Sequence, residues 1–120
     1  YRHSSYYQRQ QIFDLGTGTH TLDYDTHAGA LCFADATATV QLPETNTLLG
    51  DTYEIFNNPL SSGLVTIRPG SLGFGQIDGL GIGVTMTVGT GLGSSFDRGV
   101  KLICMGGTTA GIQWAIIGGA

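Results

Sequence analysis

The chain has few charged residues: only 12% of its 120 residues are Asp, Glu, Lys or Arg, and the formal net charge is −4. Its five cations are scattered rather than gathered on one element. Because binding to a phosphate backbone needs a concentrated basic surface, we expect no nucleic-acid partner. No apolar run approaches the roughly 20 residues that cross a bilayer, and no signal peptide opens the chain, so we expect a soluble protein without a membrane partner.

Long runs of Ala, Glu, Lys and Leu at helical period are also missing, while glycine supplies 20 of the residues. The sequence therefore predicts no helix longer than about two turns, and instead many short strands joined by turns. The chain is long enough for one hydrophobic core and too short for a second, which indicates a single domain.

Cysteine occurs twice, at Cys32 and Cys104, each inside an apolar run typical of a strand. We interpret both as buried free thiols, with a disulfide as the alternative, because small disulfide-stabilised domains contain more cysteine. A metal site built on these two residues would need further ligands at a suitable spacing, and none accompany them. We therefore expect no metal and no cofactor.

The clearest local pattern lies in residues 52–69, where two alternating runs flank a segment rich in Asn, Pro, Ser and Gly. Side chains alternate across a strand, so every second residue of each run shares a face. The flanked segment holds residues that favour turns. The pattern predicts a β-hairpin with a loop longer than the tightest class. The residues expected to face the core are Tyr53, Ile55, Val65 and Ile67, and Asn57 shares the face of Tyr53 and Ile55.

Other segments with strand character predict an all-β fold. They lie at residues 19–24, 30–33, 37–42, 74–78, 84–88, 100–105 and 111–117. In the fifth of these, Val84, Met86 and Val88 are expected to face inward, and the last two form a closing hairpin that contains Trp114. The spacing favours a small antiparallel β-sandwich or jelly-roll-like domain of eight or nine short strands.

Residues 1–15 differ from the rest because they are polar, rich in tyrosine and free of glycine. We interpret them as an N-terminal arm, or a first edge strand, that precedes a β-sandwich domain at residues 16–120. Tyrosine and arginine are enriched at protein interfaces, so Tyr1, Tyr6, Tyr7 and Arg9 are candidate docking residues. The alternative is a frayed terminus.

Several apolar residues fall on the outward face of the predicted strands, namely Phe56, Leu64, Ile103 and Met105, with Ile117 as a further candidate. A patch of exposed apolar residues usually marks a partner surface. The alternative is that the inward and outward assignment shifts by one residue at a β-bulge, which glycine-rich strands favour.

Few residues of the chain stand in patterns typical of catalysis. His20, Asp23, Asp25 and His27 form a loose cluster, but strand alternation directs His20 away from both aspartates. We therefore interpret the cluster as a solvated strand end rather than a metal site. The glycine strings lack the helix that phosphate-binding loops need, and no serine stands in a nucleophile motif, so we expect no enzymatic activity.

A series of short motifs runs through residues 19–117. Leu42-Pro43 ends one strand, and an aromatic-x-aliphatic-x-Asn strand follows at residues 53–57. Val-Thr-Ile at 65–67, Ile-Asp-Gly at 77–79, Val-Thr at 84–85 and the closing segment 101–117 complete the series. This series resembles a pattern that recurs in small structural domains of tailed bacteriophages, including tail-fibre modules and head decoration proteins.

The resemblance implies a β-sandwich virion component, frequently trimeric, without catalytic activity. The outward apolar residues and the tyrosine-rich arm favour a protein packed against other subunits. We therefore expect a bacteriophage capsid decoration (cement) protein on the capsid surface, with the major capsid protein and further copies of itself as partners. A tail-fibre or receptor-binding module is the alternative.

Overall fold

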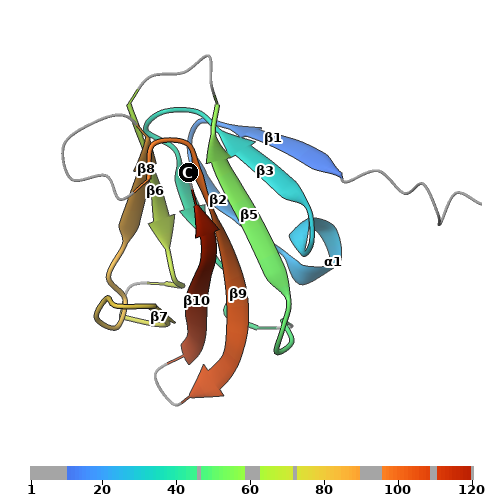
Figure 1. Cartoon of the computed structure of the whole chain (residues 1–120), viewed down its shortest axis with the longest axis vertical. Helices are drawn as coiled ribbons and strands as arrows, with labels where there is room; N and C mark the ends of the chain where they lie inside the picture. Colours follow the sequence, from blue (N-terminus) through green and yellow to red (C-terminus); the bar gives the residue numbers. More distant parts are fainter. Residues whose placement is uncertain are drawn as a thin grey trace, which may run out of the picture.

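The computed structural model in Figure 1 describes residues 11–45, 47–58, 63–71, 73–89, 96–108 and 111–119. These residues form ten strands and one short helix. They are β1 (Ile12–Gly16), β2 (Thr19–Thr21), α1 (Tyr24–His27), β3 (Leu31–Ala34), β4 (Thr39–Gln41), β5 (Thr52–Asn57), β6 (Leu64–Arg68), β7 (Gln76–Ile77), β8 (Met86–Gly89), β9 (Gly99–Thr108) and β10 (Gly111–Gly119).

The strands make two sheets, one of six strands in the order β1-β3-β5-β9-β10-β7 and one of four in the order β2-β4-β6-β8. The pairs β1–β3, β3–β5, β2–β4, β4–β6 and β7–β10 are parallel, while β5–β9, β9–β10 and β6–β8 are antiparallel. The predominantly β fold is therefore confirmed, but both sheets are mixed, and five of the eight strand pairs are parallel where a wholly antiparallel sandwich was predicted.

The chain moves from one sheet to the other after every strand from β1 to β8. Its first six strands form a coil of three turns, β1–β2, β3–β4 and β5–β6, and each turn adds one parallel strand to each sheet (Figure 1). The predicted hairpin over residues 52–69 is therefore wrong, because β5 and β6 belong to different sheets. Alternation identifies a strand and its buried face, but it does not identify the neighbouring strand.

The closing hairpin is confirmed, since β9 and β10 pair antiparallel with Trp114 opposite Cys104. Its two strands bury Leu102, Cys104 and Trp114 in the core between the sheets. Both cysteines are buried and free, as the sequence predicted.

The predicted inward residues of β5 and β6 are all buried. Tyr53, Ile55, Val65 and Ile67 are inaccessible to solvent, and Asn57 is 8% exposed. In the segment at 84–88, Met86 and Val88 are buried, but Val84 is 45% exposed. The strand begins only at Met86, so Val84 lies in the preceding turn and its predicted inward orientation is wrong.

Two boundaries also differ from the predictions. The strand expected at 19–24 ends at Thr21, and Tyr24 begins α1, where the backbone N–H of Asp23 donates to Nδ1 of His27 at 2.9 Å. The boundary drawn after residue 15 falls inside β1, which is an edge strand of the six-stranded sheet. No helix of the described residues is long and apolar enough to span a membrane.

Candidate functional site

The two sheets present outer faces of different chemistry. On the four-stranded sheet, direct register partners align Thr19, Thr39, Thr66 and Thr87 in one row across all four strands. A neighbouring row contains Thr21, Gln41 and Arg68. Threonine on the solvent side and a branched apolar residue on the core side suit a half-buried strand. This outer face is therefore polar over most of its described surface.

The outer face of the six-stranded sheet is mainly apolar. Phe33 and Phe56 are register partners on β3 and β5, and their ring centroids lie 5.9 Å apart. Ile103 on β9 is half-buried, while Met105 is 55% and Ile117 is 52% exposed. Exposed apolar residues that share one sheet face are typical of a partner surface. We call this surface the apolar face.

The structure therefore brings together part of the predicted partner surface. Phe56, Ile103 and Met105 lie on the apolar face, on the neighbouring strands β5 and β9. Leu64 lies on β6, whose outer face belongs to the other sheet, so its assignment to the same surface is wrong. The candidate docking residues Tyr1, Tyr6, Tyr7 and Arg9 lie outside the described residues.

Glycines shape a hollow of about 230 Å³ in the apolar face. The hollow is lined by Glu54, Phe56, Gly99, Val100, Lys101, Gly118 and Gly119. The ring of Phe56 lies over Gly99, where an added Cβ would stand 2.6 Å from Cγ of that ring. At Gly118, by contrast, an added Cβ would make an ordinary contact of 3.7 Å with Cβ of Lys101. Part of the hollow therefore exists because position 118 has no side chain.

Glu54 and Lys101 are the charged residues beside this hollow. They are register partners on β5 and β9, with Nζ of Lys101 4.0 Å from Oε1 of Glu54. The side chain of Lys101 is 43% exposed and that of Glu54 is 23% exposed, so the pair is open to solvent and contributes little to stability. Neither residue was predicted from the sequence as part of a site. The outward positions of β5 and β9 were readable from alternation, but their adjacency required the strand pairing.

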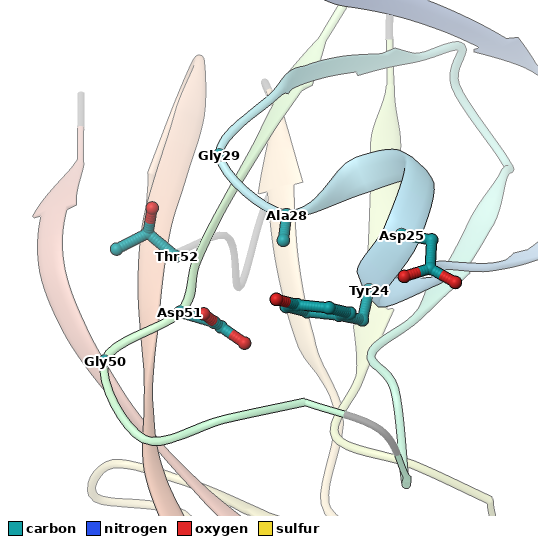
Figure 2. Close-up of a pocket in the computed structure, with 7 residues that line it drawn as sticks. All are labelled: Tyr24, Asp25, Ala28, Gly29, Gly50, Asp51 and Thr52. Carbon is teal, nitrogen blue, oxygen red and sulfur yellow. The ribbon is translucent and has the colours of Figure 1, made fainter.

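A second candidate site is a polar cavity of about 470 Å³ between α1 and the start of β5. It is lined by Tyr24, Asp25, Ala28, Gly29, Gly50, Asp51 and Thr52. Figure 2 shows the hydroxyl of Tyr24 directed toward the side of Asp51, with the carboxylate of Asp25 at the opposite end of the ring. An aromatic ring flanked by carboxylates can accept a ligand that carries hydrogen-bond donors.

One wall of this cavity is the turn at residues 47–51, which several hydrogen bonds hold in place. Oδ2 of Asp51 accepts hydrogen bonds from the backbone N–H of Leu48 at 2.6 Å and from the hydroxyl of Thr47 at 3.3 Å. The backbone N–H of Gly50 donates to the carbonyl oxygen of Cys104 at 2.8 Å, which ties the turn to β9. Asp51 therefore has a structural role that a binding experiment must keep intact.

The histidines near α1 make hydrogen bonds to residues close to them in the chain. Nε2 of His20 lies 2.6 Å from the carbonyl oxygen of Thr17, and Nδ1 of His27 accepts the N–H of Asp23. Burial lowers the pKa of His27, and its ring packs edge-on against Phe13 with centroids 5.0 Å apart. Among the described residues, no group of three or more His, Cys, Asp or Glu side chains is arranged to hold a metal ion.

Comparison with models of known protein families gives no match, and no curated protein matches the chain. The function must therefore be argued from the residues and their geometry.

Proposed function

We propose that this chain is a non-enzymatic structural protein of a bacteriophage virion, a capsid decoration (cement) protein that docks on the shell and stabilises it. In this proposal the two sheets form a small sandwich-type domain, and its interfaces perform the function. The observation that carries the proposal is the contrast between the two outer faces, one apolar and one lined with threonine. This asymmetry is expected of a subunit that buries one face against a partner and exposes the other face to solvent.

The mechanism needs no covalent chemistry. Any subunit that binds the assembled shell but not its separated parts stabilises the assembled state by mass action. A contact that buries about 800 Å² on each partner is sufficient for a specific and stable interface. The apolar face is such a contact surface between copies of the chain, and the tyrosine and arginine residues of the N-terminal segment are the candidate anchors to the shell.

The test is the stability of capsids with and without this protein. Capsids that lack it should rupture at a lower temperature or a smaller osmotic shock, and adding the purified chain should restore the resistance. The Met105→Lys variant should restore less, because a charge at an exposed position of the apolar face disfavours burial. Equal rupture of capsids with and without the protein would refute the cement role.

A tail-fibre or receptor-binding module is the second candidate, and the cavity beside α1 is the observation that favours it. It predicts binding to host cells or to their surface glycans. The Tyr24→Phe and Asp25→Asn variants should weaken that binding without unfolding the chain, since neither side chain is buried in the core. Absence of binding to host cells, together with a measurable effect on capsid rupture, would decide for the first candidate.

A further inference from the structure

The two charges at the centre of the apolar face form a self-complementary pair. Glu54 on β5 and Lys101 on β9 face each other across the middle of the six-stranded sheet, since two strands lie beyond each of them in the order β1-β3-β5-β9-β10-β7. Apolar side chains lie around them, among them Leu31 on β3, Phe56 on β5 and Ile103 on β9, together with the polar Thr52 on β5 and, on the edge strand β1, Asp14. A surface with one positive and one negative charge side by side can match a second copy of itself.

We propose that two copies of this chain pack the apolar faces of their six-stranded sheets together, about a two-fold axis that runs along the strands between β5 and β9. This axis sets β5 of one copy against β9 of the second copy. Glu54 of each copy then lies opposite Lys101 of the other, and the pairing occurs twice because a two-fold interface uses the same patch on both subunits. The inference does not depend on the virion role.

The charges also select this axis over the other two-fold arrangement of facing sheets. An axis across the strands through the row of Glu54 and Lys101 would set β5 against β5 and β9 against β9. Glu54 would then oppose Glu54, and Lys101 would oppose Lys101. Like charges opposed in an interface cost several kcal/mol, so the axis along the strands is the favoured one. The phage resemblance implies a trimer instead, and a trimer with three-fold symmetry has no two-fold axis between any two of its subunits.

The shape of the face agrees with this axis. Leu31, Glu54, Lys101 and Gly118 are register partners in one row across β3, β5, β9 and β10. The axis between β5 and β9 therefore sets Leu31 of one copy opposite Gly118 of the second. Position 118 contributes to the hollow of about 230 Å³. An aliphatic side chain of one copy thus faces a hollow of the other.

The area is sufficient for a moderate dimer. With about 4.8 Å between strands, the six-stranded sheet is roughly 24 Å across, and its two central strands are roughly 20 Å and 33 Å long at about 3.3 Å per residue. The projected face therefore covers roughly 500–800 Å² per copy, close to the 800 Å² or so per partner of a standard interface. We expect a dimer that dissociates in the micromolar range, with the two sheets packed about 30° apart by their twist.

Sedimentation equilibrium of the full chain, over a range from about 1 µM to several hundred µM, tests the proposal. The chain should approach twice its 12.6 kDa mass as its concentration rises. The charge reversals Glu54→Lys and Lys101→Glu should each weaken self-association about tenfold or more, because each creates two like-charge oppositions. An equal mixture of the two variants should recover the dimer, since every opposition in the mixed pair is then between unlike charges.

The matched control is Arg68→Glu, a charge reversal on the outer face of the four-stranded sheet. It should leave the dissociation constant unchanged. Far-UV circular dichroism and thermal unfolding of each variant establish that it is folded. A chain that stays at 12.6 kDa throughout, a trimer mass, or a variant mixture no more associated than its components would each overturn the proposal.

A second pair of variants tests the contact between Leu31 and the hollow. Gly118→Val places an aliphatic side chain in the hollow, and its Cβ makes an ordinary contact with Cβ of Lys101. It should weaken the dimer while the single chain stays folded. Gly107→Val is the control, because an added Cβ at Gly107 meets no atom within 4 Å and this position on β9 lies away from the hollow. Equal dimerisation of both variants would refute the proposed axis.

Discussion

Asn57 offers the sharpest test of how the chain passes from one sheet to the other. It ends β5, is 8% exposed, and its Nδ2 donates to the carbonyl oxygens of Gly63 at 2.8 Å and Val88 at 3.1 Å. These two bonds connect the end of β5 in the six-stranded sheet to the residue that directly precedes β6 and to β8 of the other sheet. The prediction is that Asn57→Ala destabilises the fold and that Asn57→Asp destabilises it more.

The magnitude follows from the partners of each atom. Two lost hydrogen bonds remove about 2 kcal/mol of stability, at about 1 kcal/mol each. Oδ1 of Asn57 is buried without a partner, so removing it returns about 1 kcal/mol. These two contributions leave a net loss of about 1 kcal/mol for alanine, and the two carbonyl oxygens left without their donor raise the expected loss toward about 3 kcal/mol. Aspartate cannot donate to the two carbonyls and buries a charge beside them, so its loss should exceed that of alanine by about 2 kcal/mol or more.

Urea unfolding monitored by the fluorescence of Trp114 measures both variants, since this single tryptophan is 2% exposed and reports on the core. Gln41→Ala, on the outer face of β4, is the control and should change the free energy of unfolding by less than about 0.5 kcal/mol. Equal stability of the alanine and aspartate variants would refute the assignment of Asn57 as a donor. An alanine variant as stable as the parent would show that the connection is held by other contacts.

Three further predictions concern packing and titration. Gly99→Ala should lower the free energy of unfolding by about 1–3 kcal/mol, because its Cβ would stand 2.6 Å from the ring of Phe56. The control Gly118→Ala should be nearly neutral in chemical denaturation, and similar losses for the two variants would contradict this packing. Burial lowers the pKa of His27 in the folded chain. As pH falls below about 6.5, the unfolded chain therefore binds a proton at this residue before the folded chain does. The stability that neutral His27 contributes is lost as pH falls toward its folded pKa. His27→Gln should remove this part of the loss when urea midpoints at pH 7 and pH 5 are compared with the parent, and an unchanged difference would count against it. Burial raises the pKa of Cys32 to about 11, so a thiol reagent at pH 8 should modify it only on unfolding, and rapid modification of the folded chain would contradict its burial.

The strand pairing was not readable from the sequence, although a weak signal of the coil was present. Thr19, Thr39 and Thr66 each precede a residue on the core side of the four-stranded sheet, and the three occupy one register row. A search for repeated short units would have aligned these segments and predicted stacked parallel strands. The pattern at residues 52–69 predicted a hairpin instead. A turn-rich segment between two alternating runs looks the same in sequence whether the chain returns to the same sheet or crosses to the other one.

The partner surface was predicted in part for the same reason. Alternation correctly gave Phe56 and Ile103 outward positions, because side-chain direction is a local property of a strand. It could not show that Leu64 belongs to the opposite face of the molecule, which depends on the sheet that β6 joins. The glycine hollow, the Glu54–Lys101 pair and the cavity beside α1 all arise between segments far apart in the chain.

The sequence by itself determined where most of the strands lie and which side of most of them is buried. These properties follow from the two-residue period and from the side chains that suit a pleated surface, both of which act over a few residues. Only the tertiary structure decided which strands are neighbours, and therefore which outward residues share a face. Pairing depends on contacts between segments that are far apart in the chain, and no pattern of a few residues shows how favourable those contacts are. The apolar face of the six-stranded sheet, with Glu54 beside Lys101 at its centre, exists only at that level.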